Sequence, residues 1–111
     1  MGYKKEEIEH ILYLYPSALR KCAEADEALH YSTDIKVKTD AEYQFNLFLV
    51  QMVQGWLNNL YQDEIEIIDY RYFKRYNYDQ ISIKLNYSTH SGVIYKAKSV
   101  IKKIERRSFN D

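Results

Sequence analysis

Several features that enzymes and membrane proteins depend on are scarce in this sequence. Its 111 residues include one proline, three glycines and one cysteine. No glycine-rich loop is present to bind a phosphate, and no serine lies in a nucleophile elbow. The histidines, His10, His30 and His90, lie far apart and show no zinc-binding spacing. We therefore expect no enzymatic activity, no bound metal and no cofactor.

The single cysteine, Cys22, has no partner for an internal disulfide and no metal ligand near it in the sequence. It falls in phase with apolar residues that recur at helical spacing in the N-terminal part of the chain. These residues are Ile8, Ile11, Leu12, Tyr15, Leu19, Cys22 and Leu29. A buried core position therefore explains Cys22 more simply than a redox role.

The first ten residues are rich in charge and lack the apolar run of a signal peptide. Glu6 also breaks the sequence pattern for N-terminal myristoylation. From these two absences we expect a cytoplasmic protein with no membrane partner.

Scarce proline and glycine, with Leu, Ile, Lys and Glu throughout, predict an all-α fold in the form of a helical bundle. With 46% hydrophobic residues and no linker rich in Pro, Gly or Ser, a single domain is expected over residues 1–111. Within it, residues 1–61 would supply long helices, the core and any dimer contact. Residues 62–107 would form a helix-turn-helix.

The N-terminal part is expected to hold two helices. The first spans about residues 5–29, and Pro16 bends it without interrupting the apolar phase. The second runs from about Asp40, with Thr39 as its cap, to Tyr61, and it is apolar over most of its circumference. One side carries Tyr43, Leu47, Val50, Leu57 and Leu60, and the other carries Phe45, Phe48, Leu49, Met52 and Trp56. Either this helix is wrapped by the rest of the chain, or one of its sides meets a second subunit in a homodimer.

A third helix is expected over residues 62–75. Acidic residues fill its first turn and basic residues its last, as the helix dipole favours. The carboxylates are Asp63, Glu64, Glu66 and Asp69. They can also be interpreted as metal ligands or as an acid and base pair, but the dipole and solvation explain them more simply.

A helix-turn-helix is predicted next. Tyr78, Ile81 and Leu85 share one face of a short helix, and Asn86 follows where the chain must turn. Asparagine tolerates the left-handed conformation that often ends a helix. The hydroxyl residues that come after it can cap the backbone amides of the following helix.

The helix after the turn separates its residues into two faces. One face is apolar and comprises Val93, Ala97, Val100, Ile101 and Ile104, and the other comprises Ser91, Tyr95, Lys98 and Lys102. The second face suits a DNA major groove, where the first turn reaches base edges and the lysines contact phosphates. A solvated amphipathic helix would look much the same, so the helix alone leaves both interpretations open.

Charge is distributed unevenly along the chain, although the net charge is zero. Residues 71–111 contain ten Lys/Arg and three Asp/Glu, a net charge of +7. Residues 1–70 contain six Lys/Arg and thirteen Asp/Glu, a net charge of −7. A basic segment around a helix-turn-helix is typical of phosphate binding, and this distribution favours DNA as the partner.

The chain also holds twelve tyrosines. Tyr70, Tyr72, Tyr76 and Tyr78 alternate with Arg and Lys, an arrangement that suits base stacking on single-stranded nucleic acid. Their helical spacing favours core and boundary positions instead, with hydroxyls that reach the surface.

The last third of the chain carries a recognisable pattern. Residues 64–73 read EIEIIDYRYF, residues 78–82 read YDQIS, and Leu85 and the stretch from Ala97-Lys98 to Lys103-Ile104 follow. This pattern resembles region four of bacterial sigma factors of the sigma-seventy class. More closely, it is similar to the small phage and prophage transcriptional regulators of the ArpU and RinA type.

Three positions depart from the family pattern. Ser82 stands where the family usually has Ala, and Asn86 stands where it usually has Gly. The interval from Ser82 to Val93 is one residue longer than in the family. We therefore expect Thr89, rather than Ser88, to cap the recognition helix.

The resemblance implies a sequence-specific regulator of transcription, of phage or prophage origin, that binds double-stranded DNA. It also implies a promoter or operator target for late or packaging genes, with RNA polymerase as a second partner. The recognition helix would span about Thr89–Arg106. The expected DNA contacts are Thr89, His90, Ser91, Tyr95, Lys96, Lys98, Lys102, Lys103 and Arg106. Which of His90, Ser91 and Gly92 faces the bases is left open.

Two alternatives accompany this prediction. Small terminase subunits of phages are also short helical proteins with a helix-turn-helix, and they recognise packaging sites as rings. Region-four folds also bind proteins, so the chain could contact RNA polymerase without binding DNA. In that case, reversing the charges of Lys98 and Lys102 would leave the activity intact.

Overall fold

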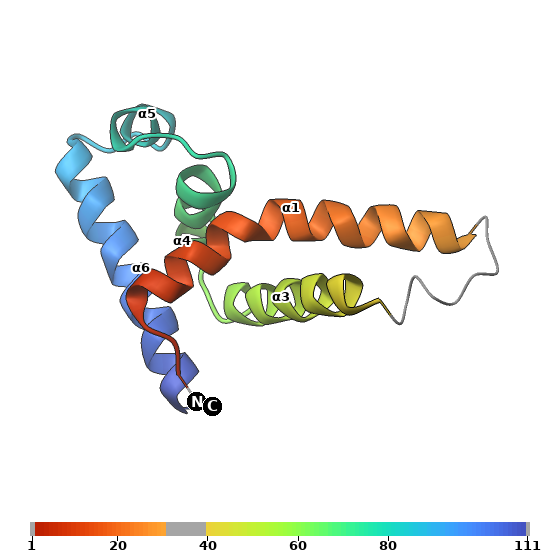
Figure 1. The fold of residues 1–111 in the computed structure, drawn as a ribbon. Helices are drawn as coiled ribbons and strands as arrows, with labels where there is room; N and C mark the ends of the chain where they lie inside the picture. The colour runs from red at the N-terminus through yellow and green to blue at the C-terminus, as the bar shows by residue number, and fades with distance from the viewer. Residues whose placement is uncertain (1, 31–39, 111) are drawn as a thin grey trace.

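Helices form along almost the whole chain, because apolar residues recur at helical spacing and proline and glycine are scarce. The computed structural model describes residues 2–30 and 40–110, and every regular element in these ranges is helical (Figure 1). In chain order the elements are α1 (Lys5–His30), α3 (Ala41–Leu57), α4 (Gln62–Ile68), η1 (Asp69–Phe73), α5 (Tyr78–Lys84) and α6 (His90–Asn110). The predicted all-α fold is confirmed.

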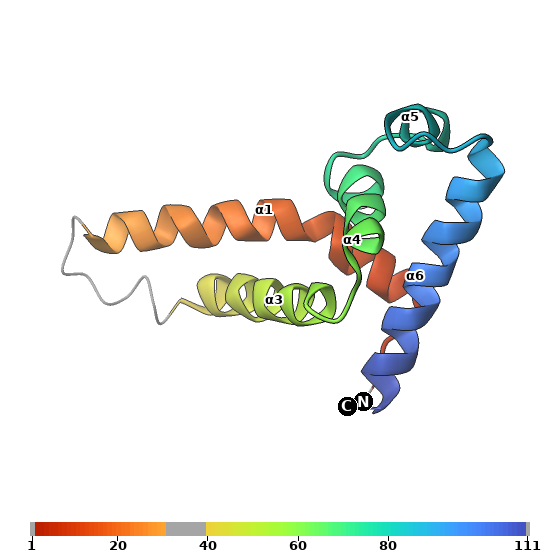
Figure 2. The same cartoon turned by 180° about the vertical axis from the view of Figure 1, so that it is seen from behind.

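The helices are arranged as a projecting hairpin and a C-terminal cluster. α1 and α3 lie side by side and antiparallel, η1 and α6 pack on α1, and α4 and α5 pack against η1 and α6 (Figures 1 and 2). The extents of 54 × 31 × 20 Å reflect this elongated arrangement. Within the described ranges, no helix is both long enough and apolar enough to span a bilayer.

A buried cluster joins α1, α3, the end of α4, η1 and α6. It comprises Ile8, Leu12, Ala18, Cys22, Leu49, Val50, Val53, Ile68, Tyr72, Val100, Ile101 and Ile104. The apolar face predicted for the last helix is confirmed, because none of its five members is more than 2% exposed. α6 is therefore fixed on the trunk of the molecule by its own hydrophobic stripe.

α1 continues through Pro16 as one helix and changes direction part-way along its length, as predicted (Figure 1). Proline has no N–H and removes one helical hydrogen bond, which accounts for the bend. Beyond the proline, Ala18 and Cys22 carry the buried face. Leu19, which was expected in that face, is 42% exposed, because the bend turns the second half of α1 relative to the first.

The Cys22 thiol is buried in this face, with an exposed fraction of 6%. Burial raises the pKa of the thiol, and the nearby carboxylate of Asp26 raises it further. A thiol with a raised pKa stays protonated at neutral pH and is a poor nucleophile, which agrees with the core interpretation of Cys22.

α3 differs from the predicted second helix at both ends. Asp40 is its N-cap, and the carboxylate accepts a hydrogen bond from the Glu42 N–H at 3.0 Å. Thr39, the predicted cap, lies outside the described residues. The helix ends at Leu57 rather than at Tyr61, because the two asparagines that follow favour a turn over a further helical turn.

Among the residues that the structure describes, only one side of α3 is buried. The buried residues are Asn46, Leu49, Val50 and Val53. On the other side, Phe45 and Phe48 are 59% and 58% exposed. The explanation in which the rest of the chain wraps α3 is therefore wrong for the described residues, and an apolar side of this helix stays open.

The predicted third helix is shorter than expected. α4 gives way to the π-helical turn η1, and the chain leaves the helix at Arg75, whose φ is 60°. Tyr72 of η1 packs on α1, with its ring centroid 5.1 Å from that of Tyr13. Phe73 packs in the same way, 4.9 Å from the ring centroid of Tyr15. Periodicity alone does not reveal such a turn, because contacts with another helix stabilise it.

Tyrosines of this region pack against the helices. Tyr72 is 2% exposed, and its hydroxyl donates a hydrogen bond to Glu9 Oε2 at 3.1 Å. Burial, together with the adjacent Glu9 carboxylate, raises the pKa of Tyr72. Tyr70 and Tyr76 pack on each other with their ring centroids 5.4 Å apart. These contacts agree with the core and boundary interpretation of the tyrosines.

α5 and α6 form the predicted helix, turn and helix. Asn77 and Gln80 cap the start of α5, where each side chain accepts a hydrogen bond from the other's backbone N–H at 2.8 and 2.9 Å. At the end of α5, Asn86 has a φ of 59°, and the Tyr87 N–H donates to the Ser82 carbonyl at 2.9 Å. The left-handed helix end predicted at Asn86 is confirmed.

Replacing Asn86 should reveal the cost of this left-handed conformation. We expect Asn86→Ala to lower the free energy of unfolding by about 1 kcal/mol and Asn86→Gly to change it little, because only glycine adopts this conformation freely. Chemical denaturation followed by circular dichroism measures both. Asn58→Ala is a matched control, since Asn58 also ends a helix but has a φ of −62°. Equal losses for the two alanine variants would contradict the prediction.

Candidate nucleic-acid interface

The start of α6 is fixed by a side-chain cap. The Thr89 hydroxyl accepts a hydrogen bond from the Gly92 N–H at 3.3 Å, so the predicted cap is confirmed. His90 begins the helix, and its Nδ1 lies 3.5 Å from Asp79 Oδ1 of α5. A Cβ at Gly92 would lie 3.4 Å from the Tyr87 ring, so this residue faces the turn. Of the three candidates, His90 and Ser91 are the exposed ones.

Two ion pairs hold α6 against α4. Lys96 Nζ lies 2.7 Å from Asp63 Oδ2, and Lys103 Nζ lies 2.9 Å from Glu64 Oε1. The Glu64 carboxylate is buried and also accepts a hydrogen bond from the Tyr61 N–H at 2.8 Å. The Lys103 ammonium lies over the Tyr61 ring, 4.4 Å from its centroid. These contacts set the rotation of α6 about its own axis.

In both ion pairs the adjacent lysine favours the ionised form of the carboxyl group. Burial alone would raise the pKa of Glu64, but the hydrogen bonds from Lys103 and from the Tyr61 N–H outweigh it, so the pKa is lowered. The hydrogen bond with Lys96 lowers the pKa of Asp63, and the same bond raises the pKa of Lys96. An adjacent carboxylate therefore balances the charge of each lysine.

Arg71 of η1 holds α5, the first helix of the helix-turn-helix. Its guanidinium lies over the Tyr78 ring at the start of α5, 4.2 Å from the centroid, and donates to the Tyr76 carbonyl at 3.2 Å. The helix-turn-helix is thus attached to the trunk at both helices, through Arg71 for α5 and through two lysines for α6.

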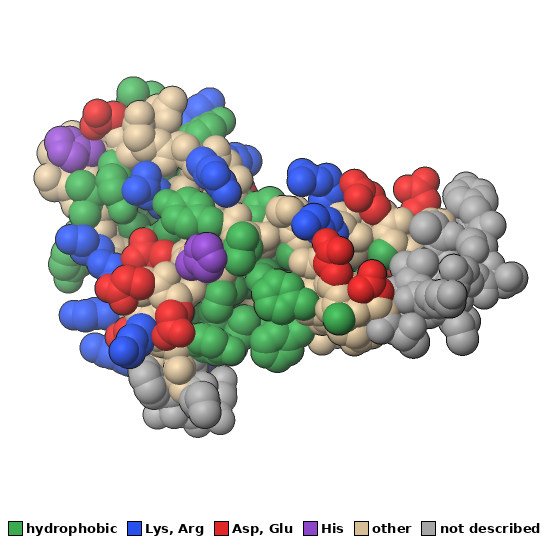
Figure 3. All heavy atoms as spheres, in the orientation of Figure 1, with side chains coloured by type: hydrophobic (Ala, Val, Ile, Leu, Met, Phe, Trp, Pro, Cys, Tyr) green, Lys and Arg blue, Asp and Glu red, His purple; other side chains and the backbone are tan. Residues whose placement is uncertain are grey.

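The opposite side of α6 is open to solvent. We call Ser91, Tyr95, Lys98, Lys102 and Arg106 the outer face of α6, because all five are exposed and lie on one side of the helix. Tyr95 is 77% exposed. Among the described residues, Lys98, Lys102 and Arg106 form no ion pair. Lys and Arg side chains line the edge of the molecule that α6 forms (Figure 3).

The structure divides the predicted contact residues into two groups. The outer face of α6 contains five of them, and the exposed His90 lies beside its first turn. Lys96 and Lys103 lie on the side that meets α4, where each pairs with a carboxylate, and their predicted contact with DNA stays a prediction. Thr89 is also mainly structural, because its hydroxyl caps the helix.

Two exposed residues near the outer face were not in the prediction. Lys5, at the start of α1, lines the same shallow hollow as Tyr95, Lys98, Lys102 and Arg106, and Ser99 lines it as well. Glu105 lies in the same hollow. Lys5 is more than 90 positions from Lys98 in the numbering, so only the folded arrangement brings the two together.

Most of the acidic residues of α4 and η1 pair with basic side chains. Asp63 and Glu64 each pair with a lysine of α6, and Asp69 pairs with Lys74 at 3.2 Å. In the described part of the chain, no group of three or more His, Cys, Asp or Glu side chains is arranged to hold a metal ion. In this structure Asp63, Glu64 and Asp69 therefore pair with basic side chains, and Glu66 forms no ion pair with a described residue.

Comparison of the chain with protein-family models, with curated proteins and with solved structures finds no match. Function must therefore be inferred from the side-chain geometry and the charges described above.

The Glu64 pair should produce a pH-dependent part of the stability. Because the folded state lowers the pKa of Glu64, the pair stabilises the fold above the ordinary glutamate pKa of about 4.3, and the gain is lost as the pH falls through the folded value. At pH ~7, we expect Glu64→Gln to cost about 1–2 kcal/mol, since Gln still accepts from the Tyr61 N–H but leaves Lys103 unpaired.

Urea unfolding of both proteins at a series of pH values measures this difference, which should shrink toward zero in acid. Glu66→Gln provides the control, because Glu66 lies on the same helix and forms no ion pair with a described residue. A Glu64→Gln deficit that persists unchanged in acid would rule out the ion pair as its cause.

Proposed function

We propose that this chain is a regulator of transcription that binds double-stranded DNA in a sequence-specific manner, with α6 as its recognition helix. The observation that carries the proposal is the division of α6 into two sides. One side is bound to the trunk by an apolar stripe and by two ion pairs. The other side presents Lys98, Lys102 and Arg106 without an ion-pair partner among the described residues.

The dimensions of α6 suit a major groove. From Ser91 to Arg106 the helix rises about 22 Å, and the groove of B-form DNA is wide enough to admit one helix. In this arrangement Ser91 and Tyr95, near the helix start, face base edges. Lys98, Lys102 and Arg106 follow on the same side and neutralise phosphates as the helix leaves the groove.

Charge distribution supports the same orientation. The net charge of residues 71–111 is +7 and that of residues 1–70 is −7. An approaching polyanion is attracted to residues 71–111 and repelled by the acidic remainder, which favours an approach toward the outer face of α6. Lys5 adds a cation at the edge of this face.

The resemblance to region four of sigma factors adds a biological setting to the proposal. It implies a promoter or operator in a phage or prophage genome as the target, with RNA polymerase as a second partner. A small-terminase-like protein would use the same helix pair on a packaging site but would form rings. A protein-binding module would contact polymerase and would not need the exposed lysines.

Selection of bound duplexes from a random pool, followed by titration across salt concentrations, tests DNA binding. We expect an enriched motif and a negative slope of log affinity against log salt. Lys98→Gln and Lys102→Gln should each reduce the slope by about 1, because each removes one phosphate contact. Arg20→Gln is a matched control, since it removes the same charge from an exposed residue of α1.

Three results would count against the proposal. Absence of binding at low salt by a folded protein would exclude DNA as the partner. Equal slopes for Lys98→Gln and Arg20→Gln would place the phosphate contacts elsewhere. Regulatory activity that survives reversal of the charges of both Lys98 and Lys102 would favour the protein-binding module.

Tyr95→Ala should separate base recognition from phosphate binding. Tyr95 is 77% exposed and lies in the part of the outer face that meets the bases, so its removal should leave the fold intact. We expect the discrimination between the selected motif and a random duplex to fall by about 1–3 kcal/mol while the salt slope stays constant. Competition binding measures the first quantity and the salt titration the second. Unchanged discrimination would place Tyr95 outside the groove.

A further inference from the structure

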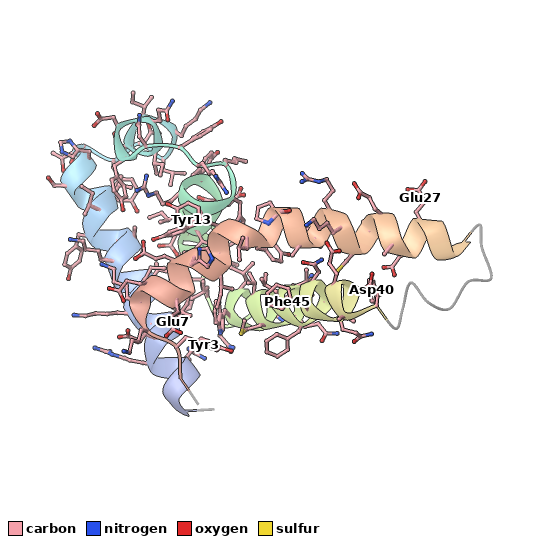
Figure 4. All side chains as sticks on the ribbon, in the orientation of Figure 1. Tyr3, Glu7, Tyr13, Glu27, Asp40 and Phe45 are labelled. Atoms are coloured by element: carbon pink, nitrogen blue, oxygen red, sulfur yellow. The ribbon has the colours of Figure 1, made fainter. Side chains whose placement is uncertain are left out.

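α3 presents an apolar side whose first half no other described element covers, and whose end, at Met52 and Gly55, lines a hollow with Ile104 and Arg107 of α6. We call Ala41, Phe45, Phe48, Met52 and Gly55 the α3 face, because they recur three and four positions apart on the side away from the core. Phe45 and Phe48 are more than half exposed, and Met52 is half-buried. Phe45 is labelled in Figure 4, and Figure 3 shows hydrophobic side chains gathered over α3 in the same orientation.

The α3 face carries no charge. Glu42 is the only charged residue of the helix, and its carboxylate lies 3.4 Å from Lys21 Nζ of α1. The neighbouring exposed side of α1 is rich in Lys and Glu by contrast. An uncharged apolar side offers no charge to the phosphates of a nucleic acid or to a strongly charged protein. It can meet an identical copy of itself without bringing like charges together.

The shape of the α3 face is also complementary to itself. Phe45 stands in its first half and Phe48 at its centre, and near its end Gly55 has no heavy atom within 4 Å of the place where a Cβ would lie. When two copies of α3 pack antiparallel about a two-fold axis near residue 50, Phe45 lies opposite Gly55 of the partner subunit. In the same register Phe48 lies opposite Met52 of the partner subunit. Phe45 of each copy then fills the gap at Gly55 of the other copy.

We propose that a second copy of this chain covers the α3 face, with the two α3 helices packed antiparallel in this register. The proposal does not depend on DNA binding, since the two surfaces share no residue. α3 spans 17 residues, or about 25 Å, so its face is smaller than the roughly 800 Å² per partner of a standard interface. We therefore expect a reversible dimer with a dissociation constant in about the micromolar range.

The position of α3 allows both copies to keep α6 accessible. The hairpin of α1 and α3 projects to one side of the molecule, and α6 forms the opposite edge (Figures 1 and 2). Pairing through α3 thus leaves the outer face of α6 uncovered in each protomer. The dimer has the symmetry that a palindromic DNA site would require.

Sedimentation equilibrium across about 1 to 500 µM protein tests the proposal, with the range chosen around the expected dissociation constant. The wild-type chain should shift from one to two chain masses. Phe48→Glu should weaken dimerisation at least tenfold, because it places a charge at the centre of the apolar contact. Ile83→Glu is the matched control, since Ile83 is an exposed apolar residue of α5, 77% exposed, and its replacement should leave the dimer unchanged.

Gly55→Leu distinguishes the proposed register from non-specific hydrophobic contact. The open space at Gly55 lets the monomer accept leucine, and leucine favours the helix more than glycine does. A non-specific contact would be strengthened by the added apolar group, whereas the proposed register must weaken because the gap that receives Phe45 is filled. Circular dichroism verifies that each variant keeps its helix content.

Four outcomes would overturn the proposal. They are a wild-type chain that stays monomeric over the whole range, a dimer unaffected by Phe48→Glu, a dimer that Gly55→Leu strengthens, and an assembly larger than two chains.

Discussion

The placement of α6 depends on the buried carboxylate of Glu64. It accepts hydrogen bonds from the Tyr61 N–H at 2.8 Å and from Lys103 at 2.9 Å, so it ties the start of α4 and the second half of α6 to one group. Because Glu64 is 8% exposed, leaving it unpaired would carry a large desolvation cost, and the fold must keep Lys103 beside it. Hydrophobic packing is non-directional and tolerates some sliding of α6 on the trunk. The ion pair instead selects one rotation and one height of the helix.

That rotation decides which cations face outward. Residues three to four apart share a side of a helix, so turning Lys96 and Lys103 toward α4 turns Lys98 and Lys102 away from it. The acids of α4 thereby neutralise two basic residues of α6. Net charge overstates what the C-terminal segment offers to an anion, since part of it serves to hold the helices together. In the proposed complex, the unpaired residues of the outer face of α6 would supply the phosphate contacts.

Sequence reasoning succeeded where the cause of a structure is local. The buried stripe of α6, the left-handed Asn86 and the Thr89 cap each depend on neighbouring residues, and all three are confirmed. It failed where the cause lies in another helix. The π-helical turn η1 depends on ring packing with α1, and the pairing of Lys103 with Glu64 joins residues 39 positions apart. Helical periodicity separates a buried from an exposed side but gives no partner for a charge, so it did not distinguish Lys96 and Lys103, which pair with α4, from Lys98 and Lys102, which do not.

The two proposed surfaces lie on different helices and differ in their physical basis, and this makes them separable. Salt weakens phosphate contacts through counterion competition, whereas it leaves an apolar contact unchanged or strengthens it. The α3 face and the outer face of α6 share no residue, so the effects on folding of substitutions in the two faces should be additive. Their effects on DNA binding need not be additive. A dimer engages its second half-site as an intramolecular step, so loss of the α3 contact would reduce affinity for a paired site far more than affinity for a single half-site. Loss of a lysine on α6 would weaken both kinds of site, because every α6 that binds DNA uses the same phosphate contacts.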